Sequence, residues 1–274
     1  VEGMPKKLGP ITLIDLSALL RSFTSVYQLL PIYRCVDVGG AELARIAETE
    51  GIPEVDSTRA NDALSFHRAI GDAVDAHREE SAYRDEGYQI YPVVGTYQRT
   101  MQSARLTDEG IALLAEYEGV DQDGDGTVPR VSATPIELSD DPREMYASER
   151  HATLQNKPQV LTQLMGVLSR EEIDLSRYRD VFGRPKPRVS LDVEDLYLSH
   201  EPITARIRCE EDSYTVRAIV RNADTGEVVL HSDHLQGGEW AEIEFPPLSA
   251  GTYRITVGED APVEAASDIF VSMD

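Results

Sequence analysis

Residues 121–129 read Asp-Gln-Asp-Gly-Asp-Gly-Thr-Val-Pro, and the next histidine along the chain is His151. A carboxylate on a tight, glycine-flanked turn after a core strand can accept a hydrogen bond from Nδ1 of a histidine on a later loop. The histidine then keeps Nε2 free to act as a general base. Asp125 is the expected carboxylate because it directly precedes the Gly-Thr-Val turn. The spacing predicts the acid (Asp125) and the base (His151) of a catalytic triad.

The same stretch also resembles a calcium-binding loop. Four residues match positions one, three, five and six of an EF-hand loop: Asp121, Asp123, Asp125 and Gly126. The twelfth position is Ser132, where a bidentate glutamate normally closes the coordination shell, and Pro129 stands where a helix normally begins. Calcium binding by the three aspartates and a plain solvated turn are the two alternatives to the triad.

The first 183 residues combine helical and strand patterns. Apolar residues at helical spacing predict helices over residues 11–30, 41–50 and 57–82, and we interpret these as a helical cap. Asp56 or Ser57 is the expected N-cap of the third helix. A strand over 88–95, a hairpin over 102–106 and 111–117, and a helix over 158–168 follow.

A different pattern begins after residues 183–187, where two prolines and a glycine predict a linker. Six alternating segments predict a small antiparallel, immunoglobulin-like β-sandwich: residues 189–193, 203–209, 214–222, 228–232, 240–245 and 253–257. Tyr253 is placed as in a tyrosine corner. The expected domains are therefore residues 1–183 and residues 188–274.

Composition narrows the classes of partner. The formal net charge of −23 disfavours nucleic acid and anionic lipid headgroups, and no apolar run reaches the length of a transmembrane segment. Cys35 and Cys209 fall in different expected domains, which predicts two buried thiols. Without a disulfide pattern nothing indicates an oxidising compartment, and a cytoplasmic location is favoured. No cofactor is expected.

After these observations, a family resemblance can be stated. Residues 19–31, Leu-Leu-Arg-Ser-Phe-Thr-Ser-Val-Tyr-Gln-Leu-Leu-Pro, resemble the Arg-Ser-Phe-x-Ser-x-Tyr-x-Leu-Leu-Pro stretch of lecithin:cholesterol acyltransferase-like α/β-hydrolases. The acidic loop and the later histidine also resemble that family, in which they supply the triad aspartate (here Asp125) and base (here His151). The resemblance covers about residues 3–170.

The resemblance implies acyl transfer or ester hydrolysis, with a lipid or another acyl ester as substrate. In the family the nucleophilic serine precedes the Arg-Ser-Phe stretch, and this chain contains no Gly-x-Ser-x-Gly elbow. The chain alone is therefore not expected to catalyse, and its partner would be the missing N-terminal part of the hydrolase domain. Phe23, Tyr27 and Leu29 are candidates for the substrate groove, with ordinary core packing as their alternative role.

The expected fold class is α/β: the C-terminal part of an α/β-hydrolase sheet with a helical cap, followed by the all-β sandwich. The expected function is that of a portion of a serine-dependent lipid acyltransferase or esterase, active in lipid metabolism. The alternative is a non-catalytic binding or scaffold protein, with a calcium-binding loop and a sandwich that serves as an interaction module.

Overall fold

The computed structural model describes residues 6–8, 11–86, 90–135, 144–169, 185–233 and 235–274. The chain divides into two compact units. The first unit comprises Val1–Ile90, Met101–Gln122 and Thr134–Arg143, and the second comprises Tyr91–Thr100, Asp123–Ala133 and Glu144–Asp274. Among the described residues, those in strands outnumber those in helices.

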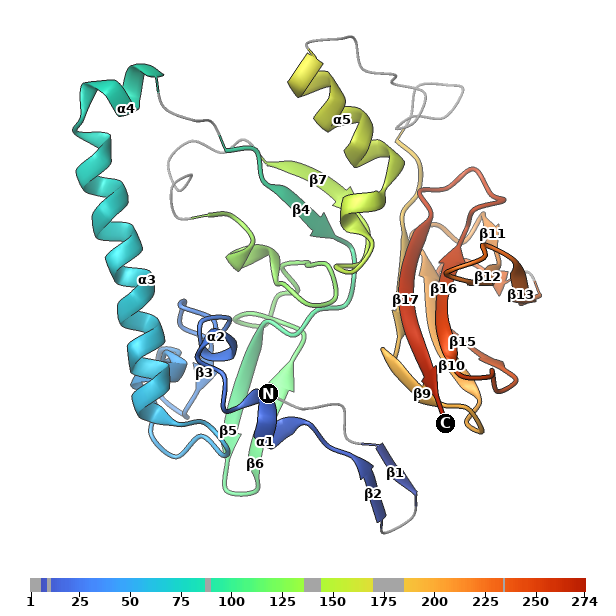
Figure 1. Ribbon diagram of the computed structural model, residues 1–274, viewed down its shortest axis with the longest axis horizontal. Coiled ribbons are helices and arrows are strands. Elements are labelled where there is room, and N and C mark those ends of the chain that lie inside the picture. The colour runs from blue at the N-terminus through green and yellow to red at the C-terminus, as the bar shows by residue number, and fades with distance from the viewer. Residues whose placement is uncertain (1–5, 9–10, 87–89, 136–143, 170–184, 234) are drawn as a thin grey trace. The chain divides into compact units, whose positions relative to one another are not determined.

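The first unit contains one long helix, α3 (Ser57–Arg78), which is drawn in light blue in Figure 1. The side chain of Asp56 caps it by accepting a hydrogen bond from the backbone N–H of Arg59 at 3.1 Å. The predicted start and N-cap of this helix are thereby confirmed, but the helix ends at Arg78 and not at residue 82, and a separate helix begins at Ser81. The other elements of this unit are β1 (Lys6–Leu8), β2 (Ile11–Ile14), α1 (Ser17–Leu20), α2 (Thr24–Tyr27), β3 (Val36–Asp37), the 3₁₀ helix η1 (Ile46–Glu48), α4 (Ser81–Glu86), β5 (Ser103–Thr107) and β6 (Gly110–Leu114).

The first unit has two small sheets. Strands β1 and β2 pair antiparallel, and β5 pairs parallel with β3 and antiparallel with β6. The β5–β6 pair is the hairpin that the sequence predicts, with a turn at residues 108–109.

The second unit contains a two-stranded parallel sheet made of β4 (Val93–Thr96) and β7 (Met145–Ser148). These strands lie side by side in Figure 1. The turn after β7 leads through η4 (Leu154–Asn156) into α5 (Pro158–Ser169), which begins at the predicted proline. The 3₁₀ helix η2 (Arg130–Ser132) follows the acidic loop.

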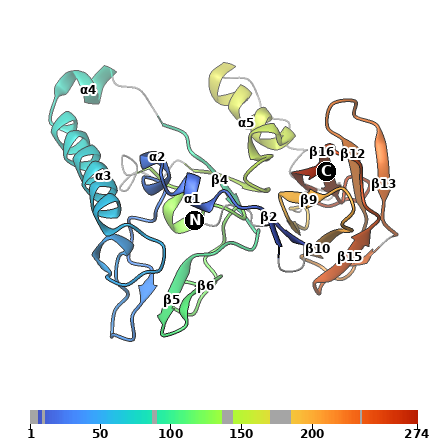
Figure 2. The ribbon, with the colours of Figure 1, turned by 60° about the horizontal axis from the view of Figure 1, so that its bottom comes forward.

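The rest of the second unit is a β-sandwich. One sheet has the order β15-β10-β8 and the other has the order β13-β12-β16-β17-β9, with β11 and β14 forming a short additional pair. Figure 2 shows these strands, coloured orange to red, from a second direction. Their bounds are β8 (Val189–Val193), β9 (Leu196–Leu198), β10 (Ile203–Cys209), β11 (Thr215–Val216), β12 (Ala218–Asn222), β13 (Val228–His231), β14 (Leu235–Gln236), β15 (Ala241–Phe245), β16 (Gly251–Val257) and β17 (Ala266–Met273).

Alternation of buried and exposed residues explains the sandwich. Strand β10 alternates strictly between buried and less buried positions, as does β17 up to Ser272, because successive side chains point to opposite faces. Phe270 lies at the centre of the core, with its ring centroid 5.5 Å from that of Tyr197 and 5.7 Å from that of Tyr253. The Tyr253 hydroxyl donates to the carbonyl of Ser249 at 2.9 Å, which is the geometry of a tyrosine corner.

The expected α/β-hydrolase sheet with a helical cap is wrong. Strands of the described residues outside the sandwich form separate sheets of two or three strands, not one continuous parallel sheet. The predicted helix over 11–30 is instead a strand and two four-residue helices, because the side chains of Asp15 and Ser22 bond nearby backbone groups and compete with the helix. The predicted helix over 41–50 is reduced to η1, since the backbone of Ala44 pairs with Val36.

The predicted boundary between residues 1–183 and 188–274 stays a prediction, because residues 170–184 lie outside the described part of the chain.

Candidate functional site

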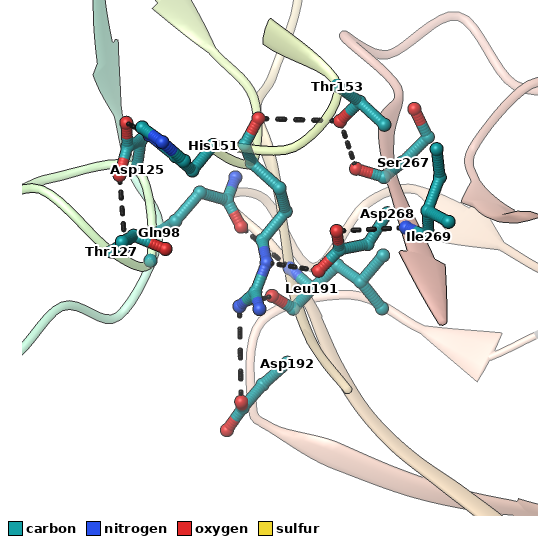
Figure 3. A network of polar contacts seen from close by, with 12 residues as sticks. Gln98, Asp125, Thr127, His151, Thr153, Leu191, Asp192, Ser267, Asp268 and Ile269 are labelled. Atoms are coloured by element: carbon teal, nitrogen blue, oxygen red, sulfur yellow. Dashed lines mark hydrogen bonds and ion pairs between the residues drawn. The ribbon is translucent and has the colours of Figure 1, made fainter. Parts of the chain in front are cut away.

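The candidate site is the pair Asp125 and His151. Nδ1 of His151 lies 2.8 Å from Oδ2 of Asp125, and the backbone N–H of His151 donates to the carbonyl of Asp125, also at 2.8 Å. The other carboxylate oxygen, Oδ1, accepts from the backbone N–H groups of Thr127 and Val128 at 2.9 and 2.6 Å. Both carboxylate oxygens therefore have partners, and His151 is held to Asp125 by one side-chain contact and one backbone hydrogen bond. Figure 3 shows Asp125 with His151 and Thr127 beside it.

The two side chains differ in exposure. The Asp125 side chain is 6% exposed, whereas that of His151 is 53% exposed. Within the described part of the chain, Nε2 of His151 has no hydrogen-bond partner. The carboxylate favours the tautomer with the proton on Nδ1. That tautomer leaves the Nε2 lone pair directed away from the carboxylate and free to take a proton.

The parallel pairing of β4 and β7 brings Asp125 and His151 together. His151 follows β7 after two residues, and a parallel bridge between Gln98 and Asp125 continues the pairing beyond the end of β4. A side chain at Gly95 would overlap the Cβ of Asp125, and its Cβ would lie 3.1 Å from the Glu149 carbonyl. Glycine is therefore required where β4 passes the acidic turn.

The turn after β4 is strained. Tyr97 has a φ of +64° and Asp123 has a φ of +71°, a region that non-glycine residues rarely adopt. The Tyr97 N–H donates to Oδ1 of Asp123 at 3.1 Å, and the guanidinium of Arg188 lies 4.2 Å from the Tyr97 ring centroid. Strain of this kind persists where the surrounding structure determines the conformation, as it often does at functional sites.

Two buried carboxyl groups lie beside the pair. Burial raises the pKa of Glu149 above its ordinary value, and the nearby Lys157 and the N–H groups of Ser267 and Arg150 offset this only in part. Burial likewise raises the pKa of Asp268 by more than the neighbouring Arg150 guanidinium lowers it. The site is thus surrounded by ionisable groups held in a poorly solvated environment.

Several site residues were not found by sequence reasoning. They are Gln98, Glu149, Arg150 and Asp268. The feature of the sequence that could have pointed to them is the charged pair Glu149-Arg150, which stands between an apolar strand and His151. This feature does not identify the partner of Arg150, because Asp268 is 118 positions away in the sequence.

The three loop aspartates do not share a ligand. Oδ1 of Asp121 accepts from Nε2 of Gln102 at 2.6 Å, Asp123 accepts from the Tyr97 N–H, and Asp125 bonds to His151. No group of three or more potential metal ligands is found among the described residues. The alternative calcium loop at Asp121, Asp123 and Asp125 stays a prediction.

The three groove candidates have different surroundings. Tyr27 is buried against Ala60 and Ala63, whereas Phe23 is 47% exposed and Leu29 is 83% exposed. A cavity lined by Tyr27 measures only about 10 Å³, which is room for about one water molecule. The assignment of these residues to a substrate groove stays a prediction.

Comparisons with known proteins give little outside the sandwich fold. No known protein family matches the sequence, and no curated protein matches it. A CARDB domain from Pyrococcus furiosus, solved in complex with di-metal ions, aligns with 32% of this chain and 90% of its own length, at 13% identity and a TM-score of 0.24. A DUF3244 family protein with an immunoglobulin-like β-sandwich fold from Bacteroides vulgatus aligns with 31% of this chain and 96% of its own length, at 13% identity and a TM-score of 0.22.

A longer alignment, over 63% of this chain, covers 32% of an engineered protein at 16% identity and a TM-score of 0.22. At these scores the alignments carry no functional argument.

The resemblance to lecithin:cholesterol acyltransferase-like α/β-hydrolases is wrong, because the described strands outside the sandwich form separate sheets of two or three strands and not a hydrolase sheet. Nothing in the comparisons supports a hydrolase, a lipase or a role in lipid metabolism. The residues that carried the resemblance, 19–31, form two four-residue helices. Only the immunoglobulin-like part of the expectation fits.

The sequence predicts no transmembrane segment. Among the helices of the described residues, none combines the length and the apolar character that a membrane span requires.

Proposed function

We propose that Asp125 and His151 form an acid–base pair that activates an oxygen nucleophile for attack on an acyl ester. The observation that carries this proposal is the 2.8 Å contact between Nδ1 of His151, whose side chain is 53% exposed, and the buried carboxylate of Asp125. A carboxylate so placed orients the imidazole and stabilises the imidazolium that forms when Nε2 takes a proton.

The proposed step moves one proton in each direction. Nε2 accepts the proton of a hydroxyl or water as its oxygen bonds to the acyl carbon, and the Nδ1 proton stays between His151 and Asp125. The same proton then passes from Nε2 to the departing alkoxide as the ester C–O bond breaks. The partners we propose are an acyl ester and water, or a polypeptide segment that carries the hydroxyl nucleophile.

The test uses the whole chain and p-nitrophenyl acetate, an activated acyl ester. The chain is expected to accelerate release of p-nitrophenol, and His151→Gln is expected to lower that rate by about tenfold or more. Asp125→Asn is expected to lower it as well, because the amide leaves the imidazole in the wrong tautomer.

His200→Gln is the control, because His200 is an exposed histidine on the sandwich and reports unspecific catalysis by imidazole. Equal rates for the unsubstituted chain, His151→Gln and His200→Gln would contradict the proposed function.

A second candidate function is binding without catalysis. It is favoured by an open cavity of about 320 Å³ on the β8–β10–β15 sheet, whose polar lining is Asp192, Glu194, Thr204, Arg206 and Glu242. In this case the Asp125–His151 pair is structural, and neither substitution at the pair changes the ester-cleavage rate.

A further inference from the structure

The loop that carries His151 is hydrogen-bonded to the sandwich. Arg150 Nε donates to Oδ2 of Asp268 at 2.7 Å, and its Nη1 donates to the carbonyl of Leu191 at 2.9 Å. Thr153 Oγ1 donates to the carbonyl of Ser267 at 2.5 Å. Figure 3 shows Thr153, Ser267, Asp268 and Leu191 around this loop, next to His151.

The segment around Gln98, which pairs with Asp125, is also hydrogen-bonded to the sandwich. The Gln98 side chain donates to the carbonyl of Val189 and accepts from the N–H of Leu191, both at 2.9 Å. Ser190 Oγ donates to the carbonyl of Tyr97 at 2.6 Å. Strand β8 of the sandwich therefore holds the strained turn whose residue Gln98 bridges to Asp125.

These contacts are buried, so the loss of one partner is costly. The side chains of Arg150 and Asp268 are 12% and 3% exposed. Removing Arg150 leaves the Asp268 carboxylate uncompensated in a poorly solvated place, and removing the Asp268 charge leaves Arg150 with the more distant Asp192, whose Oδ1 lies 4.0 Å from Nη1. Arg150 immediately precedes His151, so its two hydrogen bonds to the sandwich restrain the segment that carries the imidazole. Hydrogen-bond geometry between Nδ1 and Oδ2 tolerates only a small displacement.

We infer that Arg150 and Asp268 are positioning residues for His151, and that the sandwich is the scaffold on which the Asp125–His151 pair is assembled. Strand β17 holds the histidine side through Asp268, and strand β8 holds the aspartate side through Gln98. The inference rests on the proposed function for the role of the pair, but the geometry it predicts is measurable without any reaction.

The test is ¹⁵N NMR of the His151 ring in the whole chain, which distinguishes a proton on Nδ1 from one on Nε2. The unsubstituted chain is expected to hold the neutral ring in the Nδ1–H form. Asp268→Asn removes the charge and keeps the size, and is expected to lower the Nδ1–H fraction by about half or more. Arg150→Lys keeps the charge and loses the two directed hydrogen bonds, and is expected to act in the same direction.

Two controls separate positioning from general loss of stability. Asp260→Asn breaks the Arg217–Asp260 ion pair of the sandwich, whose length of 2.6 Å is similar. Tyr253→Phe weakens the buried core without contact with Arg150. Both are expected to leave the His151 tautomer unchanged. A shift in Tyr253→Phe as large as that in Asp268→Asn overturns the inference.

The outcomes also separate this inference from the proposed function. If the unsubstituted chain lacks the Nδ1–H form, the acid–base pair itself fails. If that form is present and survives both Asp268→Asn and Arg150→Lys, only the positioning role fails.

If neither variant folds, the unsubstituted chain is heated and the NMR signals of His151 Nδ1–H and Arg150 Nε–H are followed. If the two residues are coupled, both signals disappear over one temperature range. Loss of the two signals over separate temperature ranges overturns the inference.

Discussion

The sandwich and the first unit bury their apolar residues in different ways. The sandwich has one cluster of 18 buried residues to which both of its sheets contribute. The described residues of the first unit include two clusters of three buried residues each, around Tyr27 and around Val36. That unit also exposes several large apolar side chains: Leu19, Phe23, Leu29, Phe66 and Leu113.

The candidate site is supported by the region with the larger core. A single large core removes apolar surface from water cooperatively, whereas small clusters stabilise only their own neighbourhood. Asp125 pairs with Gln98, and His151 follows Arg150 in the chain. Gln98 and Arg150 are each hydrogen-bonded to a strand of the large core. The comparison therefore predicts that loss of the specific contacts of Arg150 with Asp268 and of Gln98 with β8 changes the site.

The largest expected effect is the loss of core volume in the sandwich. Ile255 is fully buried, and Ile255→Ala is expected to lower the free energy of unfolding by about 2–5 kcal/mol. Leu64→Ala removes a buried side chain of α3, in the unit with the smaller buried clusters. It is expected to lower the free energy of unfolding by about 1–2 kcal/mol. Denaturant unfolding measures both, with Trp240 fluorescence following the sandwich and circular dichroism following the helices. Equal losses would remove the contrast between the two regions.

The next effect is steric and local to the site. Gly95→Ala places a methyl group against the Cβ of Asp125. It is expected to cost about 1–3 kcal/mol and to abolish the Nδ1–H form of His151, because the carboxylate must move. Unfolding curves and ¹⁵N NMR measure the two effects. Gly40→Ala is the matched control, since the nearest atom to a Cβ there is 3.7 Å away. A normal His151 spectrum in Gly95→Ala would show that the site tolerates displacement.

A smaller effect is expected at the tyrosine corner. Tyr253→Phe removes the hydrogen bond to the Ser249 carbonyl and is expected to lower the free energy of unfolding by about 1 kcal/mol. Tyr214→Phe is the control, because the described residues include no hydrogen-bond partner for the Tyr214 hydroxyl. Thermal unfolding of the two variants checks the difference. Similar losses of stability in the two variants would mean that the hydroxyl of Tyr253 contributes nothing beyond the packing of its ring.

The smallest effect is a dependence on pH. Because the pKa of Glu149 is raised in the folded chain, its contribution to stability is fully present below the ordinary glutamate pKa and is lost as the pH rises through the raised value. The unsubstituted chain should therefore lose stability relative to Glu149→Gln over that interval. Melting temperatures of both proteins from about pH 4 upward measure this. The exposed Glu227→Gln should run parallel to the unsubstituted chain, and a parallel Glu149→Gln would contradict the prediction.

Sequence periodicity located the elements that depend on local pattern. The sandwich strands, the hairpin β5–β6, the helix α3 with its Asp56 cap and the start of α5 at Pro158 all follow from residue spacing and capping chemistry. The same reasoning failed over residues 11–30, where apolar spacing was helical but side-chain hydrogen bonds and strand pairing prevailed. It also missed β17, whose position depends on pairing with β16 and β9.

The residue types of the candidate pair could be predicted from the order of residues, because a carboxylate on a glycine-flanked turn and a later histidine are visible there. The sandwich could be predicted as well, because alternation along a strand is a local property. The contacts by which Gln98, Arg150 and Asp268 join the pair to the sandwich are visible only in the folded chain. Hydrogen bonds between residues about 90–120 positions apart depend on how sheets meet in space, and no local pattern encodes them.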